Sequence, residues 1–471
     1  MATITTISPI TSEPLLTRTS LTESEIPSVV GRSRTAFEAF QESHPTLESR
    51  QQIIKKFLDL LLEKKDEIAK DITEQMGRPI RYTAKEVETA VKRAQFMLRI
   101  SDDVLKTEVS SEEDAEEGVK KYVTKEPHGV VLSVFAWNYP WLILVNSLIP
   151  ALLAGNAIII KPSPQTPTVA ETAVQLLESA GLPKDVAQFI HCGDPSIIQT
   201  LVVNEDIDVV SFTGSVQGGI AIQKAAAERT IPVILELGGK DPAYVREDVD
   251  VAYTAGEIVD GAVFNSGQSC CAIERVYVHE SVHDQFVEEV KKVLQGYNIG
   301  DPRKQETLLG PVVSKASVER VKEQVEDAVK KGAKVETPEG VFEKSELGGW
   351  FVQPELLTGC NHDMEVMREE TFGPLIPIMK VSSDEEAIRL MNDSNFGLTA
   401  SIWSKDIGKA QQLLKKVKAG TAYVNRSDYP APDLAWTGWK ESGKGVSMGW
   451  HGWGGAFKVR SWNVKTPGVY Q

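Results

Sequence analysis

The sequence has only four cysteines among its 471 residues, at positions 192, 270, 271 and 360. They are too few and too scattered for a framework of disulfide bonds, and none has the CxxC spacing of a zinc site. The seven histidines show no HExxH or other paired ligand spacing. We therefore predict no metal site, and we expect a reducing compartment, the cytoplasm.

Positive charge is also scarce. The chain has 51 Lys and Arg against 66 Asp and Glu, a net charge of −15. This excess would repel a nucleic-acid backbone and an anionic lipid surface, so we expect neither as a partner. The first seventeen residues hold no Lys or Arg and therefore lack the basic part of a secretory signal or transit peptide. Residues before about Ser20 are rich in Thr, Ser and Pro, and we expect them to be loose or arm-like.

Charge is absent from residues 129–160, a stretch long enough to span a bilayer. Proline, glycine and asparagine residues interrupt it, however, and would leave backbone and amide groups without partners in lipid. In a soluble protein they mark turns. The stretch is therefore predicted to be a buried strand, loop, helix, loop and strand.

The remaining pattern predicts an α/β protein. Helical spacing over residues 47–100, with Gly77 and Pro79 between two long helices, predicts a helical cover. Short apolar runs without polar alternation then alternate with helical patterns, which is typical of parallel sheets covered by helices. The runs lie at 130–135, 157–161, 187–191, 208–212 and 232–237, with helices near 169–179 and after Gly218. A second α/β region follows over 252–418, with helices near 282–294, 318–330 and 384–391.

Two adjacent cysteines stand in FNSGQSCCA, residues 264–272, a glycine-containing turn after a helical stretch. A lone cysteine is usually inert and buried. In a turn that opens onto a cleft, backbone N–H dipoles can instead stabilise the reactive thiolate. Taken alone, the pattern leaves both interpretations open.

Glu236 ends an otherwise apolar strand in VILELGGKDP, residues 233–242. Carboxylates rarely lie in such runs unless they are paired or are held for proton transfer with a raised pKa. A structural ion pair with Lys240 is the alternative.

Three further segments follow predicted strands, where the loops of a parallel sheet open onto the ligand crevice. Asn138, in AWNYP, could donate to a developing oxyanion or could cap a turn before Pro140. VSFTGSVQGG, residues 210–219, would suit a phosphate, although it is not a GxGxxG motif. Lys161 precedes a rigid proline loop and could be a site lysine or a solvated one.

Taken together, WNYP, KPSPQTP, FTGSxxxG, LELGGK, FNSGQSC and EETFGP occur in the order and separation seen in the NAD(P)-dependent aldehyde dehydrogenase superfamily. Over essentially its whole length the chain resembles a member. The resemblance implies a Rossmann-like NAD(P)-binding domain (1–107 and 128–238), a second α/β catalytic domain (239–440) and a β oligomerisation segment (108–127 and 455–471). It also implies a homodimer or homotetramer.

The resemblance implies that Cys270 is the nucleophile, attacking an aldehyde to give a thiohemiacetal whose oxyanion Asn138 and the Cys270 N–H stabilise. Hydride transfer to NAD(P)+ would leave a thioester, which water activated by Glu236 hydrolyses to the acid. The implied cofactor residues are Trp137, Lys161, Ser163, Gly214, Ser215, Gly219, Glu370 and Phe372, with Lys161 and Glu370 on the two riboses and Ser215 on the pyrophosphate. The expected substrate-lining residues are Tyr139, Ile143, Asn146, Ser269, Cys271, Tyr429 and Trp436.

Two departures from the family pattern bear on specificity. Pro164 stands where NAD-preferring members often carry a glutamate that binds the adenine ribose, so NAD is expected but NADP stays possible. The C-terminal pattern reads AWTGWKESG at 435–443, followed by Ser-Met-Gly in place of Glu-Leu-Gly. With no clear pair of arginines for a distal carboxylate, a semialdehyde acid is not favoured over neutral or aromatic aldehydes. The alternatives are a branch that acylates coenzyme A and a non-catalytic, cofactor-binding homologue.

Overall fold

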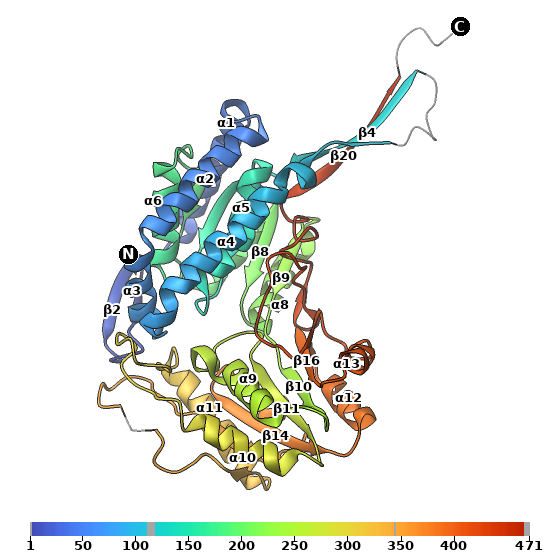
Figure 1. The fold of residues 1–471 in the computed structure, drawn as a ribbon. Helices are drawn as coiled ribbons and strands as arrows, with labels where there is room; N and C mark the ends of the chain where they lie inside the picture. Colours follow the sequence, from blue (N-terminus) through green and yellow to red (C-terminus); the bar gives the residue numbers. More distant parts are fainter. Residues whose placement is uncertain (1, 111–117, 343–344, 466–471) are drawn as a thin grey trace.

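The computed structural model describes residues 2–110, 118–342 and 345–465. It contains two open, mostly parallel β-sheets with their helices and an arm of antiparallel strands that projects from the body (Figure 1). Apolar side chains from both faces of the strands are buried in separate cores, as for Val131 on one face of the first sheet and Leu132 on the other. The α/β fold class predicted from the uninterrupted apolar runs is confirmed.

The first sheet has the strand order β19-β9-β8-β5-β6-β7. All neighbours are parallel except β19, which runs antiparallel to β9. Each predicted apolar run in this region overlaps one of its strands. The bounds are β5 Val130–Val134, β6 Ala157–Lys161, β7 Ala187–Phe189, β8 Val209–Thr213, β9 Val233–Glu236 and β19 Gly443–Lys444.

The helices beside this sheet are more numerous than predicted. Residues 47–100 were expected to form two long helices, but Lys64 separates a third, because its backbone leaves the helical range between α2 and α3. Another helix, α1, precedes them. The bounds are α1 Ile26–Ser43, α2 Leu47–Glu63, α3 Lys65–Met76, α4 Ile80–Leu105, α5 Pro140–Ala154, α6 Thr168–Ser179, α7 Pro195–Val203 and α8 Val216–Ala225.

The uncharged stretch 129–160 folds as predicted into strand β5, helix α5 and strand β6. Gly155 ends α5 in the left-handed region, with φ of 96°, and so turns the chain into β6. Within the described ranges, no helix is both long and apolar enough to cross a membrane.

The second sheet has the order β12-β13-β14-β11-β10-β16-β17, with only β12 antiparallel to its neighbour. Its strands are β10 Asp241–Val245, β11 Ile273–His279, β12 Lys334–Val335, β13 Glu355–Thr358, β14 Leu375–Val381, β16 Thr399–Trp403 and β17 Thr421–Val424. Its helices are α9 Val251–Val263, α10 His283–Leu294, α11 Lys315–Lys330, α12 Asp384–Asn392 and α13 Ile407–Leu414. Shorter elements are β15 Phe396–Gly397, β18 Trp439–Lys440 and the 3₁₀ turns η1 Glu23–Glu25, η3 Ala226–Glu228, η4 Phe264–Gly267 and η5 Glu365–Met367.

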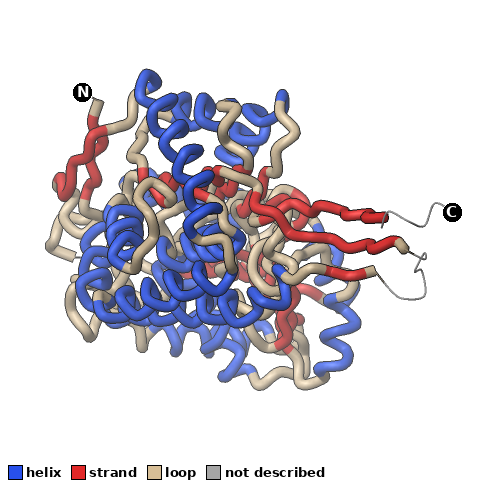
Figure 2. The backbone as a smooth tube through the Cα atoms, turned by 90° about the horizontal axis from the view of Figure 1, so that it is seen from above, coloured by secondary structure: helices blue, strands red, loops and turns tan. Residues whose placement is uncertain are grey.

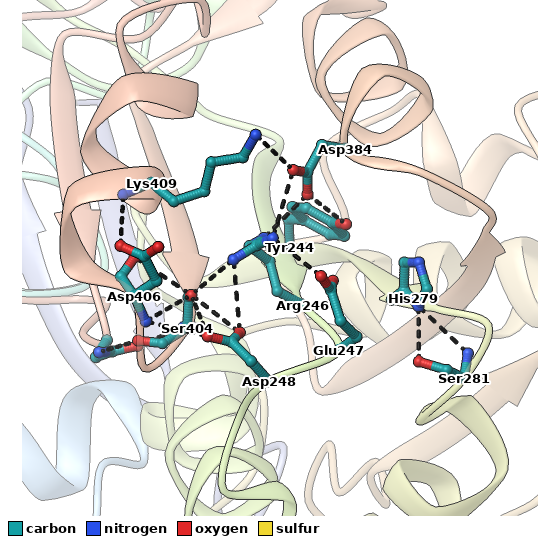
Figure 3. Close-up of polar contacts among 11 residues, drawn as sticks. Tyr244, Arg246, Glu247, Asp248, His279, Ser281, Asp384, Ser404, Asp406 and Lys409 are labelled. Carbon is teal, nitrogen blue, oxygen red and sulfur yellow. Dashed lines mark hydrogen bonds and ion pairs between the residues drawn. The ribbon is translucent and has the colours of Figure 1, made fainter.

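A network of charges closes the carboxyl end of β10 and β16 (Figure 3). Arg246 Nε donates to Asp384 Oδ1 at 3.0 Å, and Arg246 Nη1 donates to Ser404 Oγ at 3.0 Å. Lys409 pairs with Asp384 Oδ2 at 3.2 Å, and Ser404 Oγ donates to Asp248. These charged and polar groups are one another's hydrogen-bond and ion-pair partners. The network therefore has a structural role and holds the first turns of α12 and α13 against the sheet.

The arm consists of β3 Glu108–Val109, β4 Val119–Pro127 and β20 Phe457–Lys465, in the order β20-β4-β3. Figures 1 and 2 both show β4 and β20 extending side by side away from the body, and β20 pairs antiparallel with β4 over its full length. Strands β3 and β4 lie within residues 108–127, which the family resemblance assigned to a β segment. Of the segments assigned to it from the sequence, 111–117 and 466–471 lie outside the described residues.

The prediction of a loose N-terminus is wrong. β1 Thr3–Ile7 and β2 Pro14–Thr19 form an antiparallel hairpin, and Ile10 between them is fully buried. Thr6 Oγ1 donates to the Pro164 carbonyl oxygen at 2.7 Å, and Trp350 N donates to the Pro9 carbonyl oxygen at 2.9 Å. The polar composition of this segment suggested disorder, but tertiary contacts with both halves of the chain order it.

Candidate active site

One cleft of about 740 Å³ contains all three residues predicted to be catalytic, Asn138, Glu236 and Cys270. All seven expected substrate-lining residues also line it, as do five of the eight implied cofactor residues. The five are Trp137, Gly214, Ser215, Glu370 and Phe372. Lys161, Ser163 and Gly219 are not among its lining residues. The carboxyl ends of β5, β8 and β9 thus meet the turn that carries Cys270.

The turn before Cys270 has an unusual backbone. Asn265 and Ser266 both adopt left-handed conformations, with φ of 54° and 56°. At Gly267 a Cβ atom would lie 2.3 Å from the Gly373 carbonyl oxygen, so only glycine fits. The turn leaves Cys270 partly exposed, whereas Cys271 is buried. The thiol predicted to react is therefore the accessible one of the pair.

Hydrogen bonds fix the position of this turn against Asn138. Asn138 is buried, and its Nδ2 donates to the Gln268 carbonyl oxygen at 3.3 Å. Asn265 Nδ2 donates to the same oxygen at 3.2 Å. The Gln268 side chain accepts from Val313 N at 2.8 Å and donates to the Asn265 carbonyl oxygen at 3.1 Å. The amide of Asn138 is thereby held against Gln268, which precedes Cys270 by two residues, on the wall of the same cleft.

Glu236 is the last residue of β9 and is buried. Its Oε1 accepts from Ser447 Oγ at 2.8 Å, while its Oε2 has no partner among the described residues. Burial raises the pKa of Glu236 to about 8. The alternative of an ion pair with Lys240 is wrong, because Lys240 Nζ donates to Glu274 at 2.7 Å and to Thr371 at 3.0 Å. The carboxyl group is free to exchange a proton in the cleft.

A second carboxyl group, that of the half-buried Asp428, contacts Ser269 and Cys271. Its Oδ1 accepts from Ser269 Oγ at 2.7 Å and from Cys271 Sγ at 2.9 Å. The hydrogen bond with Cys270, together with burial, raises the pKa of Cys271 well above its ordinary value. Cys271 therefore stays a thiol at neutral pH, which leaves Cys270 as the candidate nucleophile.

The first sheet also forms a site for an anion. The chain leaves β8 through Gly214 and enters α8 at Ser215, whose Oγ accepts from Gly218 N at 3.2 Å. The N-terminus of a helix attracts negative charge through its unpaired N–H groups. Gly219 does not face the cleft but allows α8 to pack on Leu237, since a Cβ there would come within 2.6 Å of that side chain. This end of the cleft fits the pyrophosphate of a dinucleotide.

Three further residues are implied in cofactor binding, and of these only Glu370 lines the cleft, whereas Lys161 and Ser163 do not. Lys161 ends β6 and is buried, which lowers the pKa of its ammonium, so it is not a solvated lysine. Ser163 Oγ accepts from Gln165 N at 3.2 Å. Glu370 Oε1 accepts from Gly239 N at 3.0 Å, and a Cβ at Gly238 would come within 2.5 Å of both Glu370 oxygens. Because Gly238 and Gly239 have no side chains, the Glu370 carboxyl group can contact their backbone directly.

Two aromatic side chains, Trp137 and Phe372, line the cleft. Trp137 and Phe372 meet edge to face, with centroids 5.6 Å apart. Phe372 adopts a left-handed φ of 51°, and its N–H donates to Glu274 Oε1 at 2.9 Å. Burial raises the pKa of Glu370, two residues earlier, to about 7. The residues present thus fit a dinucleotide: a helix N-terminus for phosphates, two polar side chains for hydroxyls and aromatic rings for a base.

Sequence reasoning missed three residues of the cleft region, Arg93, Asp428 and Ser447. Arg93 lies on α4, where its spacing is that of any helical residue, and nothing in the sequence indicates that it faces the cleft. Asp428 lies in a loop and has a left-handed φ of 45°. Only Ser447 had a signal, since it replaces the glutamate of the Glu-Leu-Gly pattern.

The comparisons with known proteins agree with this geometry. The model of the aldehyde dehydrogenase family matches residues 1–461. Betaine aldehyde dehydrogenase of Bacillus subtilis is 31% identical over 94% of this chain and 90% of its own length. Lactaldehyde dehydrogenase of Escherichia coli is 34% identical over 89% of this chain and 88% of its own.

Solved structures agree as well. The NADP-dependent glyceraldehyde-3-phosphate dehydrogenase from Bacillus halodurans, complexed with NADP, superposes with a TM-score of 0.93 at 30% identity, covering 98% of this chain and 96% of that one. Betaine aldehyde dehydrogenase from Staphylococcus aureus in complex with NAD+ gives 0.93 at 28% identity, covering 99% and 92%. The chain belongs to the aldehyde dehydrogenase family and oxidises an aldehyde with NAD(P)+ as its cofactor.

Proposed function

We propose that this oxidation proceeds through covalent catalysis at Cys270 and ends in hydrolysis, releasing a carboxylic acid. The observation that carries the proposal is that the half-buried Cys270 thiol, the Asn138 amide and the Glu236 carboxyl group line one cleft. A nucleophile, an oxyanion donor and a base in one cavity are the groups that acyl transfer requires.

In the first step, the thiolate of Cys270 attacks the aldehyde carbon and forms a carbon–sulfur bond. The carbonyl oxygen becomes an oxyanion, which accepts hydrogen bonds from Asn138 Nδ2 and from the Cys270 N–H. Because these donors are held in place by the Gln268 turn, they need little reorganisation when the charge develops. One oxyanion donor typically contributes about 10²- to 10³-fold in rate.

When bound, NAD(P)+ supplies the acceptor for the hydride that leaves the substrate carbon. We assign the pyrophosphate to Ser215 and the N-terminus of α8, and the two riboses to Lys161 and Glu370. Pro164, the third residue after Lys161, brings no carboxylate to this site, so a 2′-phosphate would meet no repulsion from that position.

The thioester left on Cys270 is hydrolysed by a water molecule that gives a proton to Glu236. The unpartnered Oε2 of Glu236 and the raised pKa of this group both support the role of base. Transfer to coenzyme A would need no such base, so the presence of Glu236 favours hydrolysis.

We further propose that the arm makes the protein a homodimer or homotetramer. Strand β20 carries exposed apolar side chains, Val459 at 65%, Val464 at 42% and Trp462 at 36%. An edge strand with such side chains is a surface for pairing with another copy.

We further propose that the rest of the chain forms a cofactor domain (1–107 and 128–238) and a catalytic domain (239–440). We also place the protein in the cytoplasm, in keeping with its four free cysteines.

The proposal is tested with purified protein, NAD+ or NADP+ and a panel of aldehydes, followed by the absorbance of the reduced cofactor. Cys270→Ala is expected to abolish turnover and to leave cofactor affinity unchanged, since no bond to the cofactor is removed. Cys360→Ala is the control, because this cysteine is buried away from the cleft lining. Turnover in Cys270→Ala at the wild-type rate would refute the assignment.

A further inference from the structure

Arg93 is a buried cation in the wall of the substrate cleft. It lies on α4, is 5% exposed, and lines the cleft together with Tyr139, Asn146 and Tyr429. The chemical steps proposed above do not use it. A charged side chain is rarely buried unless it is paired with an opposite charge, so the burial of Arg93 indicates a specific role.

The partners of Arg93 within the chain are neutral. Nη1 donates to the Leu142 carbonyl oxygen at 3.0 Å and to Asn146 Oδ1 at 3.1 Å. Nη2 has one long contact, 3.4 Å, to the Pro430 carbonyl oxygen. Nε is buried and has no partner among the described residues, and no described carboxylate forms an ion pair with this guanidinium. The guanidinium thus has no counterion, and its Nη2 atom keeps hydrogen-bonding capacity for a charged group.

Two other buried arginines differ from Arg93. Arg78 also has an unpartnered Nε, but it has a counterion, because its Nη1 pairs with Glu86 at 2.6 Å. Arg275 has no ion pair with a described carboxylate side chain, yet its Nε donates to the Lys240 carbonyl oxygen at 2.8 Å and both its Nη atoms donate to oxygens. Neither arginine lines the cleft. Arg93 combines burial, an unpartnered Nε, the lack of a counterion and a place in the cleft wall.

The charge on Arg93 persists at neutral pH. Burial lowers its pKa to about 10, which still leaves the guanidinium protonated. Arg93, Cys270 and Cys271 line the same cleft, so the guanidinium faces the cavity that contains the reacting thiol. A substrate group bound to Arg93 would belong to the same molecule as the aldehyde under attack.

The acidic groups of the cleft do not cancel this charge. Asp428 accepts hydrogen bonds from Ser269 and Cys271 on Oδ1, burial raises its pKa, and it forms no ion pair with Arg93. Glu257 and Asp260 are exposed, as is the cation Lys92. Arg320 lies on α11 and touches the Thr371 carbonyl oxygen, beside Glu370 at the cofactor end.

We propose that Arg93 binds the carboxylate of an aldehyde acid, so that the preferred substrates are semialdehyde acids rather than neutral or cationic aldehydes. This inference rests on the function proposed above. A single buried cation balances a single negative charge, which favours a carboxylate over a phosphate dianion. Tyr139 and Asn146, which line the same wall, supply further polar groups near that end.

The test compares two aldehydes of similar length that differ in charge, 4-oxobutanoate and its neutral methyl ester. For the wild-type enzyme with NAD+ or NADP+, kcat/KM for the acid is expected to exceed that for the ester by about 10- to 100-fold, the value of hydrogen bonding between charged groups. Arg93→Met should lower kcat/KM for the acid by the same factor and leave the ester within about threefold.

Arg99→Met is the matched control, because Arg99 is exposed on the same helix and does not line the cleft. It should change neither substrate. Equal rates for acid and ester in the wild type, an equal loss for both in Arg93→Met, or a preference for glyceraldehyde 3-phosphate over 4-oxobutanoate would each overturn the inference. If no aldehyde at all is oxidised, the proposed function fails instead, so the two failures are distinct.

A measurement on the wild type alone covers the case in which Arg93→Met does not fold. Succinate should compete with the ester substrate, and its neutral dimethyl ester should inhibit at least about tenfold more weakly. Inhibition of equal strength by the two compounds would overturn the inference.

Discussion

Replacing Glu236 by Gln removes the proposed base while keeping the size of the side chain and an oxygen that can accept from Ser447. Acylation of Cys270 does not need Glu236, but hydrolysis of the thioester does. The variant should therefore release about one equivalent of reduced cofactor per active site in a burst and then turn over about 10²- to 10⁴-fold more slowly than the wild type.

The raised pKa sets the pH dependence. A carboxyl group with a pKa of about 8 is roughly one-tenth ionised at pH 7 and roughly nine-tenths ionised at pH 9. If hydrolysis limits turnover, the wild-type kcat should rise about tenfold over this interval, because only the ionised form can accept the proton. The residual steady-state rate of Glu236→Gln should lack this rise.

The raised pKa of Glu236 also predicts that the free energy of unfolding depends on pH. The folded protein holds the Glu236 proton more tightly than the unfolded chain, so its contribution to the free energy of unfolding is fully present below about pH 4.5 and is lost as pH rises through about 8. Glu236→Gln should remove this part of the pH dependence, as measured by urea unfolding at several pH values.

Stopped-flow and steady-state absorbance of the reduced cofactor measure the burst and the pH profile. Glu369→Gln is the matched control, because Glu369 is exposed and does not line the cleft. Equal steady-state activity of Glu236→Gln and wild type, with the same pH profile, would refute the assignment of the base.

Three further changes test other parts of the account. Ser447→Ala removes a hydrogen bond that lowers the pKa of Glu236, so the rise of kcat should move to higher pH; an unchanged profile would contradict this. Asn138→Ala should lower kcat/KM about 10²- to 10³-fold with cofactor affinity unchanged, measured by cofactor titration. Arg246→Met leaves the half-buried Asp384 with Lys409 as its remaining cation and should lower the free energy of unfolding by about 2 kcal/mol in denaturant titrations, with kcat unchanged.

The fold was largely predictable because both faces of its central strands are buried. Runs such as 157–161 therefore carry no polar alternation, and the turns between strands and helices keep their glycines and prolines. The N-terminal hairpin was not predictable, because its polar strands gain order from contacts such as that of Thr6 with Pro164, 158 residues away. The break at Lys64 was missed because neither glycine nor proline marks it.

The residues of the candidate site also fall into those that the sequence predicted and those that it did not. Cys270, Glu236 and Asn138 stand in short motifs that follow strands, so their residue types and order are visible in the sequence. Arg93 reaches the cleft from α4, and Asp428 from a loop near the C-terminus; only the packing of distant segments brings them to the cysteines. Residues that position or select a substrate are therefore harder to predict than residues that react with it.

The central claim is that Cys270 alone forms the covalent bond to substrate. The direct measurement is peptide mass spectrometry of Glu236→Gln after incubation with NAD+ and an aldehyde and an acid quench. We predict the mass of one acyl group on Cys270, retained when Cys271 is replaced by Ala. An acyl group on Cys271 or Cys360, or a burst of reduced cofactor with no acylated cysteine, would contradict the account.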